Sequence, residues 1–212
     1  MIVASVMTRN PIFVSPDMSI TEAKALMIKE KIGKLPVLDK NNKLIGIITK
    51  KDLVKAGPSA ATTLDMYEIG YLLSKLKVEK VMEKKVITVQ QTEVVEEAAR
   101  IMADNAIGCL PIMKDDLLVG IITDTDLFRA FINMFGARKK GIRVTFQLVD
   151  KLGVFARVTK NISEKKGNIV SLVTADGSDL TKTQCTMKVS GISKEEIERI
   201  LQEENAELED IR

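Results

Sequence analysis

The sequence predicts an α/β protein, α+β in its layering, made of two βαββα repeats followed by a smaller βαββαβ segment. An eleven-residue stretch, Gly46–Ala56, recurs as Gly120–Ala130, and in each copy an apolar run leads to a threonine with an aspartate three positions later. The residues upstream also match, at an offset of 75 that falls to 74 past Asp39. A register kept over about fifty residues indicates duplication. The last third has its own pattern of alternating strands and amphipathic helices.

The composition is that of a globular protein with a core, at 45% hydrophobic and 29% charged residues in a chain of 212. The net charge of +3 lacks the basic excess of a non-specific nucleic-acid binder. No apolar run is long enough to span a membrane, and the N-terminus lacks the features of a signal peptide. We therefore expect a cytoplasmic protein that binds neither nucleic acid nor membrane.

The chain contains no histidine, which removes the commonest general base and histidine-ligated metals. The two cysteines, Cys109 and Cys185, lie in apolar patterns and predict buried thiols rather than a disulfide or a four-cysteine zinc site. No paired carboxylates or activated lysine stand out. We therefore expect no catalytic residue, no metal and no enzyme. An enzyme built at a domain interface stays as an alternative that detectable turnover of a nucleotide would support.

The first repeat is expected to begin with a strand at Ile12–Val14, followed by a helix that Ser19 caps. Gly33 stands where a left-handed helix C-cap is usual. Two strands, Leu35–Leu38 and Leu44–Thr49, then form a hairpin, and a second helix closes the repeat.

The second repeat is expected to follow the same order. Its strand at Ile87–Val89 leads to a helix capped at Thr92, with Gly108 in the C-cap position. Its hairpin strands are Leu110–Met113 and Leu117–Thr123, and a helix follows them.

The last third is expected to begin after a basic hinge and to continue as βαββαβ. Asp150 is placed to cap its first helix, and Ser193 is placed to cap its second. The expected strands and second helix are, in order, Ile142–Leu148, Ile169–Val173, Lys182–Val189, the helix Ser193–Asn205, and Glu207–Ile211.

Each repeat ends in a corner where a strand meets the start of a helix. The first corner carries Thr49 and Asp52, and the second corner carries Thr123 and Asp126. Unpaired N–H groups and the helix dipole at such a start favour an anion. The same spacing also fits a capping box, which stabilises a helix start by roughly 1 kcal/mol and requires no ligand. The residues alone leave both interpretations open.

The βαββα order, the two Gly-x-Leu-Pro segments and the paired Gly-x-x-Thr-x-x-Asp corners resemble tandem CBS domains, the pair called a Bateman module. The resemblance covers roughly residues 1–135. The chain breaks at Gly57–Ser59, and Leu64–Lys77 is expected to form a helix between the repeats. The resulting boundaries are 1–57 for CBS domain 1, 58–77 for a linker helix, 78–137 for CBS domain 2, 138–141 for a hinge and 142–212 for the last domain.

That last domain resembles an ACT domain, a ferredoxin-like module that often binds amino acids. Asp150, Gly153 and Asn168 match the ligand-loop positions of the family, whereas Leu152 stands where many members have proline. A helix cap and a turn are the plainer interpretations of Asp150 and Asn168. The order of the three domains resembles the acetoin-utilisation proteins of the B type.

The CBS resemblance implies adenosine nucleotides (AMP, ADP or ATP) in up to two clefts between the repeats. The threonine would meet a phosphate and the aspartate would accept hydrogen bonds from a ribose diol. The second corner would serve a pocket lined by Ile12, Ile32, Gly33 and Pro36. The first corner would serve one lined by Ile87, Ile107, Gly108 and Pro111.

The two corners differ in charge. Lys50 and Lys51 follow the first threonine, whereas Asp124 follows the second. On charge alone we expect the first corner to accept polyphosphates better.

The function that these features imply is regulatory. We expect a homodimer that senses an adenosine nucleotide, which Mg²⁺ can accompany, and an amino acid at the ACT domain. No cofactor is expected to be required. The output would be a change in a regulated partner protein or in assembly. One alternative is a structural dimerisation module without a nucleotide; another is a sensor of S-adenosylmethionine or a cyclic dinucleotide.

Overall fold

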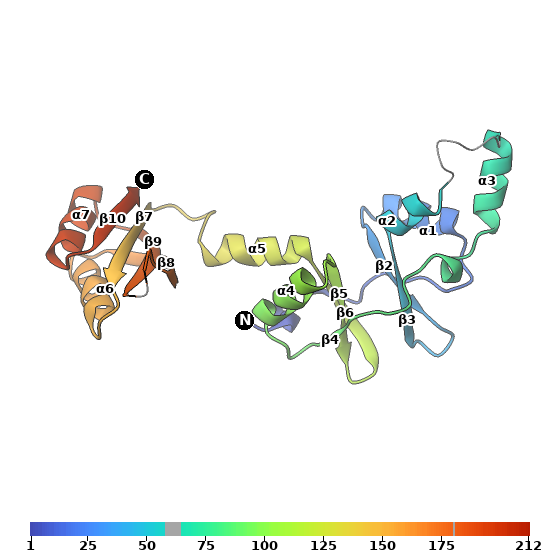
Figure 1. Ribbon diagram of the computed structural model, residues 1–212, viewed down its shortest axis with the longest axis horizontal. Coiled ribbons are helices and arrows are strands. Elements are labelled where there is room, and N and C mark those ends of the chain that lie inside the picture. The colour runs from blue at the N-terminus through green and yellow to red at the C-terminus, as the bar shows by residue number, and fades with distance from the viewer. Residues whose placement is uncertain (58–64, 180) are drawn as a thin grey trace. The chain divides into compact units, whose positions relative to one another are not determined.

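A computed structural model describes residues 1–57, 65–179 and 181–212 (Figure 1). The expected break at Gly57–Ser59 and the start of the linker helix, including Leu64, therefore lie partly outside the described residues. The chain divides into two compact units, an N-terminal unit of Met1–Leu127 and a C-terminal unit of Phe128–Arg212.

The first repeat follows the expected order of elements. Its elements are a 3₁₀ turn η1 (Val3–Ser5), β1 (Thr8–Arg9), α1 (Ile20–Lys29), β2 (Lys34–Leu38), β3 (Leu44–Thr49) and α2 (Lys50–Lys55). Ser19 caps α1 in a capping box with Glu22, which confirms the predicted cap. The predicted strand at Ile12–Val14 is wrong in extent, because Val14 alone forms a bridge, parallel to Val37.

The second repeat follows a helix, α3 (Met66–Lys75). Its elements are a 3₁₀ turn η2 (Val78–Lys80), β4 (Val89–Gln90), α4 (Val95–Asp104), β5 (Cys109–Lys114), β6 (Leu117–Thr123) and α5 (Asp124–Met134). The predicted cap at Thr92 is wrong: α4 starts later, at an N-cap of Val94 that has no side-chain cap. The carbonyl of Met1 instead accepts a hydrogen bond from the Val95 amide at 2.9 Å, so the N-terminal chain satisfies a donor of the first turn.

The predicted glycine C-caps are also wrong, because both helices end earlier. Lys31 (φ 54°) takes the left-handed position after α1, and Ala106 (φ 51°) takes it after α4. The amide of Ile32 donates to the Met27 carbonyl at 2.9 Å, the long bond of a Schellman motif. Gly33 and its counterpart Gly108 lie beside the corners instead, where their carbonyls accept hydrogen bonds from the amides of Lys50 and Asp124.

The two repeats exchange their leading segments. Strand β1 of the first repeat pairs antiparallel with β6 of the second, so the larger sheet has the order β1-β6-β5-β4. In the second repeat, Glu83 exchanges backbone hydrogen bonds of 2.9 Å with Ile47 of β3. Each repeat therefore completes the other's sheet, and neither is an independent layer.

Apolar packing fixes the two sheets against each other. Ile47, Cys109 and Ile121 form a buried cluster to which β3, β5 and β6 contribute one residue each, with Val86 packed against it. A second cluster fills the first repeat, around Met27, Leu35 and Ile48 among others. The N-terminal unit is thus held together by contacts that cross from one repeat to the other.

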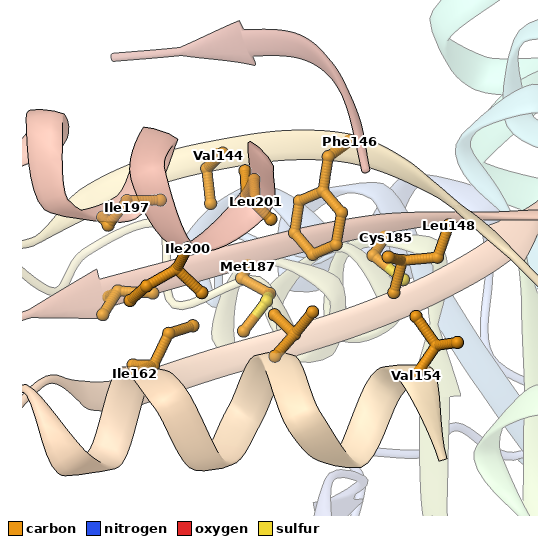
Figure 2. Packing of buried hydrophobic residues seen from close by; sticks show 12 residues of the cluster. Val144, Phe146, Leu148, Val154, Ile162, Cys185, Met187, Ile197, Ile200 and Leu201 are labelled. Atoms are coloured by element: carbon orange, nitrogen blue, oxygen red, sulfur yellow. The ribbon is translucent and has the colours of Figure 1, made fainter. Parts of the chain in front are cut away.

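The C-terminal unit confirms the expected βαββαβ order. Its elements are β7 (Ile142–Val149), α6 (Val154–Glu164), β8 (Asn168–Asp176), β9 (Lys182–Ser190), α7 (Lys194–Glu203) and β10 (Glu207–Ile211). The four strands form an antiparallel sheet in the order β10-β7-β9-β8. Both helices pack with inward side chains of β7 and β9 around fully buried Phe146 and Met187 (Figure 2).

Of the two helix N-caps predicted in this unit, one is confirmed and the other is wrong. Ser193 caps α7 in a capping box with Glu196, as expected. Asp150 does not cap α6: the N-cap is Gly153, whose φ of 84° is left-handed and suits glycine. The amide of Asp150 donates to the Thr181 carbonyl at 2.7 Å instead, which holds Asp150 in the turn before the helix. Throughout the described ranges, no helix is long and apolar enough to cross a membrane.

Candidate functional site

The two strand-to-helix corners have nearly identical geometry. In the first corner, the amide and the hydroxyl of Thr49 both donate to Oδ2 of Asp52, at 2.8 and 2.7 Å. In the second, the same groups of Thr123 donate to Oδ2 of Asp126 at 2.9 and 2.7 Å. The capping boxes are therefore formed. In both boxes the two hydrogen bonds from the threonine go to the same carboxylate oxygen, Oδ2.

The corners differ in enclosure. Asp126 is 6% exposed, whereas Asp52 is half-buried. Helix α2 is also only six residues long, against eleven for α5. The second corner is therefore the more enclosed of the two and stands on the longer helix.

Each Gly-x-Leu-Pro segment lies beside the threonine of its own repeat. Lys34 is the strand partner of Thr49, and Cys109 is the strand partner of Thr123. The contact that crosses between the repeats here is made by the Lys34 side chain. The predicted pockets, which combine the corner of one repeat with the Gly-x-Leu-Pro segment of the other, stay a prediction.

The predicted pocket walls differ in how much surface they present. Ile12 is 40% exposed, and Ile32, Ile87 and Ile107 are half-buried, as are Gly33 and Gly108. Pro36 and Pro111 are buried in strands β2 and β5, where they pair with Ile47 and Ile121. The isoleucines therefore keep surface for a ligand, while the prolines mainly belong to the sheets.

Lys34 joins the two repeats by charge, a contact that the sequence analysis missed. Its ammonium group lies 3.2 Å from Oδ1 of Asp124 and also donates to the Gly108 carbonyl. The side chain of Lys34 is 22% exposed, and the side chain of Asp124 is 54% exposed. The available signal was a change of charge between aligned positions: Lys34 aligns with the neutral Cys109, and Asp124 aligns with Lys50.

The surroundings of Asp124 favour its ionised form. Partial burial acts to raise the pKa of this carboxyl, but hydrogen bonds from Lys34 and from the Thr125 amide outweigh it and lower the pKa below its usual value. The neighbouring Cys109 behaves in the opposite way, because burial raises the pKa of its thiol to about 11. At neutral pH the second corner therefore holds a carboxylate and an uncharged thiol.

A cavity of about 440 Å³ lies among α1, α2 and α3. It is lined by Ile20, Thr21, Lys24, Met27, Ile28, Lys50, Leu53, Val54, Gly57 and Leu73. It reaches the first corner through Lys50, but its lining includes none of the predicted pocket-wall residues. It is therefore a separate apolar hollow of the first repeat.

The predicted amino-acid ligands of the C-terminal unit are not brought together within one chain. Asp150 and Gly153 precede α6, and Asn168 begins β8 after the helix ends. A helix of eleven residues spans about 16 Å. Nowhere in the described part of the chain do three metal-binding side chains of the His, Cys, Asp or Glu types cluster.

Comparison with known proteins identifies relatives of the N-terminal unit. The model of the CBS domain matches residues 3–59 and 78–133. The CBS domain pair of protein MJ0100, solved with 5′-methylthioadenosine and S-adenosyl-L-methionine, is 31% identical, with a TM-score of 0.53 over 66% of this chain and 98% of that one. CBSX2, solved with AMP, is 31% identical, with a TM-score of 0.50 over 62% of this chain and 96% of that one.

A third solved structure is also similar to about two thirds of the chain. A putative acetoin utilization protein (AcuB) from Vibrio cholerae is 32% identical, with a TM-score of 0.55 over 66% of this chain and 96% of that one. Among curated proteins, L-aspartate semialdehyde sulfurtransferase from Methanocaldococcus jannaschii is 32% identical over 139 residues, and the chain spans 24% of that protein's length.

Proposed function

Because the chain belongs to the CBS-domain family, we propose that its N-terminal unit is a non-catalytic regulatory sensor that binds adenosine ligands at the two corners. The observation that carries the proposal is that both corners preserve the Thr–Asp pair with nearly the same hydrogen-bond geometry. Solved relatives with AMP and with S-adenosylmethionine support this class of ligand.

The chemistry of the corners suits such a ligand. A carboxylate only accepts hydrogen bonds, so Asp52 and Asp126 match the two hydroxyls of a ribose. The isoleucines Ile12, Ile32, Ile87 and Ile107 offer apolar surface for a purine. Because the repeats share sheets, a ligand that contacts both can bias their arrangement, by as much as its affinities for the two arrangements differ. The signal then passes to a partner protein or to the homodimer.

The test is calorimetric titration of the nucleotide-stripped full chain with AMP, ADP, ATP and S-adenosylmethionine. Asp52→Asn and Asp126→Asn keep an oxygen for the capping box but replace the second carboxylate oxygen with an amide donor. Loss of a hydrogen bond to a charged group predicts a fall in affinity of about tenfold to a hundredfold at the altered corner.

Glu22→Gln is the matched control, because it alters the capping box of α1 in the same repeat without touching a corner. Binding that survives both aspartate substitutions at wild-type strength would contradict the proposal.

A second candidate is a structural dimerisation module, which the completed capping boxes favour because they account for both Thr–Asp pairs without a ligand. Silence of the wild-type chain across the whole titration panel would support it. We do not extend the proposal to an amino-acid ligand, since Asp150 and Asn168 lie at opposite ends of α6.

A further inference from the structure

The two corners carry opposite chemistry at equivalent positions. The strand partner of Thr49 is Lys34, and the residue after that threonine is Lys50. The strand partner of Thr123 is the buried, neutral Cys109, and the residue after that threonine is Asp124. Two cations of the first corner are thus replaced by a thiol and a carboxylate in the second.

The carboxylate of Asp124 is held over the strand beside its corner. The backbone amide of Asp124 donates to the Gly108 carbonyl at 3.1 Å, which places Asp124 next to the Gly108–Cys109 segment. A Cβ atom at Gly108 would lie 2.9 Å from Oδ2 of Asp124 and 3.1 Å from the Lys34 ammonium, so a side chain there would displace these two groups. The Thr125 amide, 2.8 Å from Oδ1, fixes the carboxylate further.

Lys34 belongs to the first repeat, but its ammonium pairs with this carboxylate of the second repeat. Its ammonium is shared between Oδ1 of Asp124 and the Gly108 carbonyl, both in the second repeat. An anion entering the second corner would face Asp124, and it would have to draw Lys34 away from an existing ion pair. A ligand without a phosphate leaves the pair intact.

From this arrangement we propose that Asp124, paired with Lys34, selects the ligands of the second corner by their charge. The corner then takes an adenosine whose 5′ substituent is uncharged or cationic, such as a thioether or a sulfonium, and disfavours a 5′-phosphate. A phosphate monoester carries about −1.5 to −2 charges at neutral pH, so it is repelled by the Asp124 carboxylate and competes with that carboxylate for the Lys34 ammonium. The inference rests on the proposed function and assigns a ligand class to one of its two sites.

The test isolates the second corner in the full chain by Asp52→Asn and compares AMP with 5′-methylthioadenosine, which differ only at the 5′ position. We expect this variant to bind 5′-methylthioadenosine about tenfold more tightly than AMP. Adding Asp124→Asn should raise the AMP affinity about tenfold, because Asn keeps the acceptor for the Thr125 amide but removes the charge. The affinity for 5′-methylthioadenosine should stay within about threefold.

Asp116→Asn is the charge-matched control, since Asp116 lies in the exposed β5–β6 turn at the other end of the hairpin from Thr123. Lys34→Met is the independent variant: it leaves Asp124 unpaired and should weaken AMP further in the Asp52→Asn background.

The outcomes separate this inference from the proposed function. If the wild-type chain binds neither ligand, the proposed function fails and the inference falls with it. If the wild-type chain binds but the Asp52→Asn chain binds neither, the second corner holds no ligand, and only the inference fails. It also fails if AMP binds the Asp52→Asn chain as tightly as 5′-methylthioadenosine, or if Asp124→Asn changes AMP binding no more than Asp116→Asn does.

Discussion

Gly46 and Gly120 open the two repeated stretches, and the structure explains them by packing. A Cβ atom at Gly46 would overlap the sulfur of Met82, and it would lie 3.2 Å from the carbonyl oxygen of Glu83. Gly120 has the same relation to Met7. Each glycine thus sits where the leading segment of the other repeat crosses it. The residues that begin the motif therefore hold the repeats together, while the threonine and aspartate that end it form the corner.

We expect Gly46→Ala to lower the free energy of unfolding by about 1–3 kcal/mol, because the added methyl overpacks a contact that includes backbone. Urea denaturation followed by circular dichroism measures the change. Gly70→Ala is the matched control: a Cβ atom there meets nothing within 4 Å, and alanine in a helix gains about 0.5–1 kcal/mol over glycine. Equal stability of the Gly46→Ala and wild-type chains would contradict the packing argument.

At the scale of elements, the helix starts show which features a sequence can predict. The caps at Ser19, Thr49 and Ser193 were predictable because both members of a capping box lie three residues apart on one helix. The predicted caps at Thr92 and Asp150 were wrong for two different reasons, one a distant group and the other a local backbone conformation. The Met1 carbonyl satisfies the start of α4, and a left-handed glycine begins α6.

The candidate site divides in the same way. The Thr–Asp pairs were visible in the sequence because they are local and repeated. The bond from Lys34 to Asp124 was not, because 90 residues separate the two positions. The exchange of leading segments was also hidden, since the match of Val3–Met7 to Val78–Met82 is the same whether each segment pairs with its own repeat or with the other. Local order follows from the sequence pattern, whereas the placement of one repeat on the other depends on tertiary contacts.

The end of helix α5 offers a test of one such tertiary contact. Within the C-terminal unit, the Lys188 ammonium donates to the Gly136 carbonyl and the Ser171 hydroxyl donates to the Phe135 carbonyl, both at 3.0 Å. These two side chains, from β9 and β8, therefore satisfy carbonyls just past the helix.

We expect Lys188→Met to lower the free energy of unfolding by about 0.5–1.5 kcal/mol, the net contribution of one hydrogen bond. We also expect faster amide hydrogen exchange in the last turn of α5. The control is Lys160→Met, which breaks only an ion pair with Glu164 whose lysine is 72% exposed and which is worth little. Unchanged exchange at the end of α5 in the Lys188→Met chain would show that the contact does not hold the helix end.

At the scale of the whole molecule, each compact unit has a core of its own and one buried cysteine within it. Cys109 belongs to the cluster between the sheets of the N-terminal unit, and Cys185 belongs to the core of the C-terminal unit (Figure 2). Burial raises the pKa of each thiol from its usual 9.0 to about 11. The stability that this shift represents is therefore complete below pH 9 and is lost as the pH rises towards 11.

These two thiols can report the opening of the two units separately. At pH 8 in mild urea, alkylation followed by mass spectrometry records how often each cysteine becomes exposed, because a buried neutral thiol does not react. We expect AMP at about a hundred times its dissociation constant to slow the modification of Cys109 about a hundredfold, since a ligand of the N-terminal unit stabilises that unit by mass action.

The modification of Cys185 should not change, because the proposed site lies wholly within the other unit. The chain carrying both Asp52→Asn and Asp126→Asn is the control: at the same AMP concentration its protection of Cys109 should fall to about tenfold or less, and Cys185 should again show none. Equal slowing at both cysteines would mean instead that the two units open together, and that the ligand acts on the whole chain rather than on the paired repeats.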